Sequence, residues 1–213
     1  MRIKLNLQIF PLIILFYFTH QIELYVMLMI FALLHEIAHM VIGIILGLKP
    51  KKLEIMALGF RIHFEKYIKK KSGVFERIII ALSGPLLNII LACAIYLIDF
   101  SIPETTRQNM VYANLLIAVF NLLPIYPLDG GRIIKALCKI KYDIKETIII
   151  MDKISYISFV ILTIISSFAI LYYKNIAILI GILALCTIVL VQERKNKWRL
   201  RAYEVILADR NKK

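Results

Sequence analysis

Six apolar runs, separated by polar loops, restrict the folds that this chain can adopt. The runs cover about residues 5–19, 24–47, 74–98, 110–127, 154–173 and 176–191. Most approach the ~20 residues that an α-helix needs to cross the hydrocarbon core of a bilayer, and 61% of all residues are hydrophobic. In hydrocarbon, helices satisfy all of their own backbone hydrogen bonds. We therefore predict an all-α polytopic membrane protein with about six transmembrane helices.

The second apolar run contains a His-Glu-x-x-His sequence at residues 35–39. Residues four apart share a helix face, so His35 and His39 can bind one metal ion. Glu36 lies next to them, where it can take a proton from an attacking water. A structural pair of histidines is the alternative, but ionisable groups at membrane depth are costly unless a function uses them. The motif therefore predicts a zinc hydrolase with Glu36 as its general base.

A catalytic zinc ion usually has three protein ligands and a water, so the motif needs one more ligand. Asp129 is the only carboxylate in or beside the fourth apolar run. Pro124 and Pro127 interrupt the helix there, and irregular backbone at membrane depth is tolerated where protein buries it or water reaches it. We predict that this segment lines a wet cavity and that Asp129 is the third zinc ligand, rather than a surface residue at a helix end.

The third apolar run contains Ser83-Gly84-Pro85 and, three residues later, Asn88. Small residues allow helices to approach closely, and a polar amide in a span commonly bonds to a neighbouring helix. We predict that Gly84 serves helix packing and that Asn88 makes an interhelical hydrogen bond.

The loop after the second run predicts a small β-hairpin at the membrane surface. Residues 60–65 alternate strictly between apolar and polar side chains, with Leu53 and Ile55 upstream. This period of two is typical of a strand. The hairpin edge can add a substrate peptide as an extra strand, and a surface hairpin with no ligand role is the equally weighted alternative. His63 is predicted to be an exposed residue rather than a metal ligand.

The net charge of +13 comes largely from Lys and Arg in alternate loops. These basic segments are the N-terminus, the loops around 48–73 and 128–153, and the tail from 192. Since basic loops stay on the cytoplasmic side, both termini are predicted to be cytoplasmic. The basic residues are expected to meet anionic lipid rather than nucleic acid.

These features predict one membrane protein with four consecutive regions. We expect a first, uncleaved membrane span at 1–23 and a catalytic membrane core at 24–132. A cytoplasmic loop and two C-terminal spans follow at 133–191, and a basic cytoplasmic tail covers 192–213.

Together, the motifs resemble the site-2 protease family of intramembrane zinc metalloproteases, peptidase family M50. The resemblance covers about residues 24–132, which correspond to the three-helix core of the family. It rests on the segments His35 to His39, Ser83 to Asn88 and Asn121 to Gly131. The form of the last segment and the layout in six runs are most similar to the stage IV sporulation protein FB type.

The resemblance implies a metalloendopeptidase that cleaves a membrane-associated protein. It implies that Asn121 and Pro127 bind substrate, with Asn121 bonding the substrate backbone or the oxyanion; helix packing is the alternative role for Asn121. For the sporulation type, the implied substrate is a sigma-factor precursor similar to pro-sigma-K, in the membrane around the forespore, and inhibitory membrane partners are implied. We expect no cytoplasmic CBS domain after the last run and no PDZ insertion between the motifs.

Two other functions are compatible with parts of the pattern. A zinc-binding membrane transporter would use buried His and Asp, but it would not need Glu36 between two ligands at this spacing. It would also place polar groups along several spans, whereas the last two runs are almost entirely apolar. A catalytically silent membrane scaffold would not need an intact Glu36. Both alternatives are less favoured than a protease.

Overall fold

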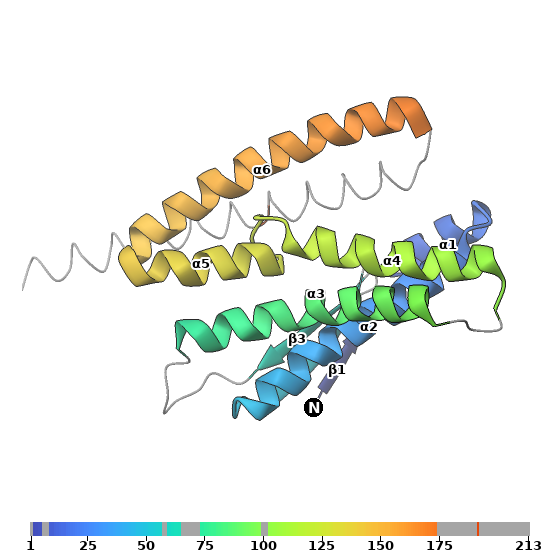
Figure 1. Ribbon diagram of the computed structural model, residues 1–213. Helices are drawn as coiled ribbons and strands as arrows, with labels where there is room; N and C mark the ends of the chain where they lie inside the picture. The colour runs from blue at the N-terminus through green and yellow to red at the C-terminus, as the bar shows by residue number, and fades with distance from the viewer. Residues whose placement is uncertain are drawn as a thin grey trace, which may run out of the picture. The chain divides into compact units, whose positions relative to one another are not determined.

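A computed structural model describes residues 2–5, 9–56, 59–64, 73–98, 102–173 and 191. Figure 1 shows the succession of helices and strands along the chain. The contacts divide the chain into two compact units, Met1–Leu122 and Leu123–Lys213.

The first unit is built mainly from helices. They are α1 (Ile9–Phe18), α2 (Ile22–Ile45), α3 (Val74–Leu97) and α4 (Glu104–Leu122). Helix α3 packs against both α2 and α4, and Figure 1 shows α3 running alongside α4. The buried residues of these two helices include several small ones: Ala81, Gly84 and Ala92 in α3, and Ala113 and Ala118 in α4. Small residues let the backbones approach closely enough for polar side chains to bond between helices.

A three-stranded sheet completes the first unit. Its strands are β1 (Arg2–Leu5), β2 (Pro50–Met56) and β3 (Gly59–Phe64). The order is β1-β2-β3, with β1 parallel and β3 antiparallel to β2. The predicted hairpin is therefore confirmed as β2 and β3, and β3 forms one edge of the sheet. Strand β1 was not predicted.

The second unit contains α5 (Asp129–Lys141) and α6 (Ile144–Tyr173), which contact each other. Helix α5 buries Asp129, both glycines that follow it and Ala136. Its last turn carries Lys139 and Lys141, which suit the negative end of the helix dipole. Helix α5 was not predicted, because the Pro- and Gly-rich segment that leads into it resembles irregular chain.

Three of the described helices are long and apolar enough to cross a membrane, as expected of an integral membrane protein. They are Ile22–Ile45, Val74–Leu97 and Ile144–Ile165. The prediction of about six spans differs from this result. Helix α1 has only 10 residues, α4 begins with a polar turn at Glu104, and the run 176–190 lies outside the described residues.

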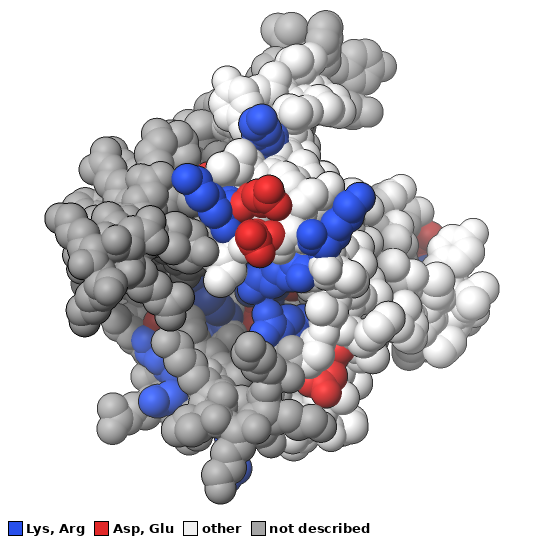
Figure 2. Space-filling view, turned by 90° about the vertical axis from the view of Figure 1, so that its left-hand side faces the viewer, with Lys and Arg blue, Asp and Glu red and all other residues white. Residues whose placement is uncertain are grey.

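The outer surfaces of the spans are apolar. Helices α2 and α3 expose large side chains that include Val26, Ile30, Phe75, Leu86 and Ile90. Such rows of exposed apolar residues suit contact with lipid. By contrast, Figure 2 shows a face of the molecule on which Lys and Arg side chains gather among Asp and Glu.

Candidate metal centre

The two histidines of the motif belong to the buried stripe of α2. Phe31, His35, His39 and Gly43 are all buried and follow one another at intervals of four residues. This spacing places them on one helix face, and α2 packs against α3 and α4. The histidine pair therefore points into the helix interface and not toward lipid.

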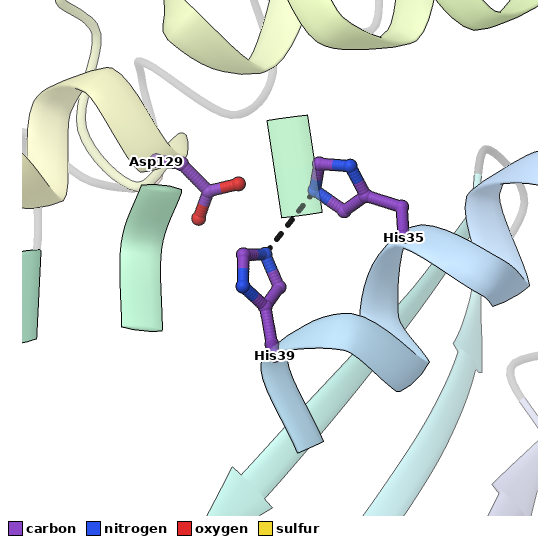
Figure 3. A group of neighbouring side chains, drawn as sticks. All are labelled: His35, His39 and Asp129. Carbon is purple, nitrogen blue, oxygen red and sulfur yellow. Dashed lines mark hydrogen bonds between the residues drawn. The ribbon is translucent and has the colours of Figure 1, made fainter. Parts of the chain in front are cut away.

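The imidazoles of His35 and His39 turn their Nε2 atoms toward each other (Figure 3). These two atoms are 3.2 Å apart. Nδ1 of His39 lies 2.6 Å from the backbone oxygen of Ile80, and Nδ1 of His35 lies 2.6 Å from Oδ1 of Asn88. Both partners are carbonyl oxygens, which only accept. Each neutral ring therefore carries its proton on Nδ1 and a lone pair on Nε2.

This geometry fits a tetrahedral zinc ion. Two nitrogens that each bind zinc at ~2.0–2.1 Å lie about 3.3 Å apart in a tetrahedral site, close to the 3.2 Å between the two Nε2 atoms. Two lone pairs at this separation repel each other unless a cation or a proton lies between them. The bonds at Nδ1 also match the outer hydrogen bonds that orient zinc-binding histidines.

Gly84 brings the bare backbone of α3 next to this pair. A Cβ atom at Gly84 would lie 2.6 Å from Nε2 of His35 and 2.6 Å from Nε2 of His39. Real Cβ atoms essentially never approach other atoms so closely. The glycine therefore leaves room for the metal position as well as allowing close packing. This role of Gly84 was not predicted, although a glycine in the middle of a long apolar helix is a signal for close approach of another group.

Glu36 contacts the β-sheet. Its Oε2 atom accepts a hydrogen bond of 3.1 Å from the backbone N–H of Ile62 in β3. Ile62 lies opposite Leu53 of β2, and successive N–H groups of a strand point in opposite directions. Because the Ile62 amide is bonded to Glu36, it faces away from β2. The outer edge of β3 therefore lies beside the candidate general base.

His63 is exposed, as predicted, and serves the hairpin. Its Nε2 lies 2.9 Å from Oε2 of Glu54, and Oε1 of the same carboxylate accepts a hydrogen bond from Lys52. The hydrogen bonds from Lys52 and from His63 lower the pKa of Glu54 to about 2. The carboxylate is therefore ionised at neutral pH and links β2 to β3 through its contact with His63.

In the second unit, Asp129 is the first residue of α5 and is buried (Figure 3). One of its carboxylate oxygens, Oδ1, accepts a hydrogen bond of 3.1 Å from Nη1 of Arg132, one helical turn later. An acidic residue in the first turn is also stabilised by the helix dipole. The carboxylate of Asp129 thus lies at the N-terminus of α5 beside a guanidinium group, and carboxylate oxygens are among the ligands that bind zinc.

The loop before Asp129 is packed onto its own unit. Ile125 is completely buried, and a Cβ atom at Gly131 would lie 2.5 Å from the backbone nitrogen of Tyr126. The same backbone nitrogen donates to Oγ of Ser155 in α6 at 3.1 Å. The Tyr126 ring contacts Lys135, whose Nζ is 3.9 Å from the ring centre. Glycine at 131 thus permits a close approach that fixes this loop against α5.

The two predicted substrate-binding residues have different settings. Asn121 lies in the last turn of α4, and its Nδ2 donates to the backbone oxygen of Ile117 at 3.0 Å. Its amide group is therefore bonded to its own helix. Pro127 lies in the loop before α5 and is partly exposed, with a cis bond from Tyr126. Their roles toward substrate stay predictions.

Residues 101–165 match Peptidase family M50. The chain is 28% identical over 124 residues to zinc metalloprotease MJ0392 of Methanocaldococcus jannaschii, a match that covers 56% of this chain and 35% of that protein. It is also 28% identical over 109 residues to stage IV sporulation protein FB of Bacillus subtilis. That match covers 50% of this chain and 37% of that protein.

The chain thus spans about a third of the length of the curated relatives that it matches. The sporulation protein is one of several relatives with similar identity, so the sporulation type is not singled out. The solved structure of the site-2 protease from Methanocaldococcus jannaschii has a TM-score of 0.68 with this chain at 22% identity. The match covers 91% of this chain and 90% of that one, and it establishes the fold.

Proposed function

We propose that this chain is an intramembrane zinc metalloprotease of the site-2 type, peptidase family M50. The observation that carries the proposal is the pair of His35 and His39 Nε2 atoms, 3.2 Å apart, with Nδ1 of each ring beside a carbonyl oxygen. Glu36 is adjacent on the same helix, and that helix is long enough to span a bilayer. A metal-binding pair with a neighbouring carboxylate is the arrangement that zinc peptidases require.

In this mechanism, the residues divide the work of hydrolysis. His35 and His39 hold the zinc ion, which, when bound, makes a water more acidic and polarises a carbonyl group. Glu36 takes a proton from the attacking water while the oxygen of that water adds to the carbonyl carbon. Glu36 then gives that proton to the leaving nitrogen as the C–N bond breaks. The products are a carboxylate and an amine.

Asp129 is the third zinc ligand in this proposal. Two histidines leave a catalytic zinc site one protein ligand short. Asp129 is a carboxylate at the start of α5, and it is buried, as are His35 and His39 in α2. Its loop is fixed by the contacts of Ile125 and Tyr126 within its own unit.

Replacing Asp129 by Ala is therefore expected to lower the zinc content of the purified protein from one ion per chain to a small fraction. Losing one of three ligands weakens zinc binding by far more than the ~10- to 100-fold that is typical of losing an outer hydrogen bond. Metal analysis of the protein measures this directly. Asp143→Ala, at an exposed position before α6, is the matched control and should keep its zinc. Full zinc content in Asp129→Ala would assign the third ligand to another residue.

The outer edge of β3 is the proposed docking site for substrate. A substrate helix must unwind to expose a peptide bond, because its carbonyls are bonded internally. An unwound segment can pair with a sheet edge as an additional strand. The Ile62 amide that such a strand would use is bonded to Glu36. Docking would exchange this bond for one to substrate and leave the Glu36 carboxylate to act on water.

Replacing Ile62 by Pro tests the docking edge, because proline removes this one N–H and is tolerated on an edge strand. We expect the KM for a single-span substrate to rise about 5- to 10-fold, the effect of one lost hydrogen bond. Zinc content should not change. Ile62→Val keeps the amide and should behave like the wild type. An unchanged KM in Ile62→Pro would show that substrate does not pair with this edge.

For the substrate itself, we propose a sporulation sigma-factor precursor of the pro-sigma-K kind, cleaved at the membrane around the forespore and controlled by inhibitory membrane partners. The support is the resemblance of residues 121–131 and the similarity to stage IV sporulation protein FB. Co-expression with a tagged precursor, and separately with an unrelated single-span protein, tests this substrate. If only the unrelated protein gave a shortened product, the protease activity would be supported and the proposed sporulation substrate would be refuted.

A further inference from the structure

A chain of buried hydrogen bonds leads from the metal centre across α3 to α4. Nδ1 of His35 lies 2.6 Å from Oδ1 of Asn88. Nδ2 of Asn88 donates to Oδ1 of Asn114 at 2.9 Å, and Nδ2 of Asn114 donates to the backbone oxygen of Met110 at 2.9 Å. Asn88 and Asn114 are completely buried. The mechanism above uses neither asparagine.

The direction of this chain is fixed at its far end. The Met110 backbone oxygen can only accept, so the amide of Asn114 must turn its NH2 group toward it. The oxygen of Asn114 then faces Asn88 and accepts from the NH2 group of Asn88. The oxygen of Asn88 is left to face His35, where it accepts from Nδ1. His35 is thereby held as the tautomer with its lone pair at Nε2.

We propose that Asn114 is a positioning residue of the metal centre, which sets the tautomer of His35 by orienting the amide of Asn88. The inference rests on the proposed zinc site. An amide group has two nearly isosteric ends, and without Asn114 the amide of Asn88 can reverse. Its NH2 group would then face Nδ1 of His35, which would have to accept, and the proton of the ring would move to Nε2.

His39 does not depend on such a chain. Its Nδ1 lies 2.6 Å from the backbone oxygen of Ile80, and a backbone carbonyl cannot exchange its oxygen for a donor as an amide side chain can. Oγ of Ser83 lies 3.1 Å from the same nitrogen. The two zinc-binding histidines are thus oriented by different means, one by fixed backbone and one by two side-chain amides. Only His35 should respond to a change at position 114.

The test is a double-mutant cycle on the zinc affinity of the full chain in detergent, measured by competition with a chelator. Asn114→Leu removes both hydrogen bonds at similar volume, and we expect zinc affinity to fall about 10- to 100-fold, the usual effect of losing an outer partner. Asn88→Asp presents an oxygen to His35 in either orientation. In that background, Asn114→Leu should change zinc affinity less than about threefold if the two residues act in series.

A purely structural role for Asn114 predicts the same loss of affinity in both backgrounds, and that result would overturn the proposal. Nitrogen NMR of the His35 ring in the metal-free protein gives a second readout, since Asn114→Leu should populate the tautomer protonated at Nε2. Asn114→Ala repeats the cycle if the Leu variant does not fold, and Asn109→Leu, at an exposed position of α4, is the matched control. A wild type that binds no zinc would refute the proposed function instead.

Discussion

Replacing Glu36 by Gln is expected to abolish peptide cleavage while zinc stays bound. Gln has nearly the same shape as Glu and its oxygen can still accept the Ile62 amide, but it cannot take up a proton. Losing a general base typically costs ~10²- to 10⁴-fold in rate, and here the same carboxylate also protonates the leaving nitrogen. The rate of cleavage of a single-span substrate and the zinc content, both measured on the purified chain, test this expectation.

Glu104→Gln provides the matched control for this experiment, because Glu104 is exposed at the start of α4. This substitution removes a carboxylate of the same kind that is distant in sequence from residues 35–39. The Glu104→Gln variant should cleave substrate at the rate of the wild type. Wild-type cleavage by Glu36→Gln would refute the assignment of Glu36 as the base.

Replacing Gly84 by Ala is expected to abolish zinc binding. The added methyl group would lie 2.6 Å from Nε2 of both His35 and His39, so it would take the space that the metal needs. Helix α3 has little room to retreat, because Ala81 and Pro85 beside this position are buried as well. Alanine is a better helix former than glycine by ~1 kcal/mol. Loss of zinc should therefore occur without loss of helix.

Metal analysis and circular dichroism of the purified variant separate these two effects. Gly73→Ala is the control, since a Cβ atom there would meet nothing within 4 Å, and it should keep its zinc. If Gly84→Ala bound one zinc ion with the affinity of the wild type, the metal would have to lie away from α3.

The local parts of the site could be predicted because helix and strand periodicity fix them. His35 and His39 share a face of α2 through their spacing alone, and the alternation of residues 60–64 defines β3. The prediction that Asn88 bonds to another helix is also confirmed, with Asn114 of α4 as its partner. In each case, the pattern of residues within one helix or strand was enough for the prediction.

The remaining features depend on distances between elements, which a local pattern does not contain. Gly84 matters because α3 approaches α2 at the level of the two imidazoles, and Asn114 matters because it lies opposite Asn88. Strand β1 has only four residues and forms through its pairing with β2. Among the described helices, three are long and apolar enough to span a membrane, and an apolar run alone does not reveal that α1 has only 10 residues.

The measurement that tests the zinc protease most directly is cleavage by the purified chain in lipid vesicles, before and after its metal is removed. A single-span substrate with a tag at each end reports the product. We predict that a chelator stops cleavage and that one equivalent of Zn²⁺ per chain restores it. Cleavage that continues at the same rate in zinc-free protein would contradict the account.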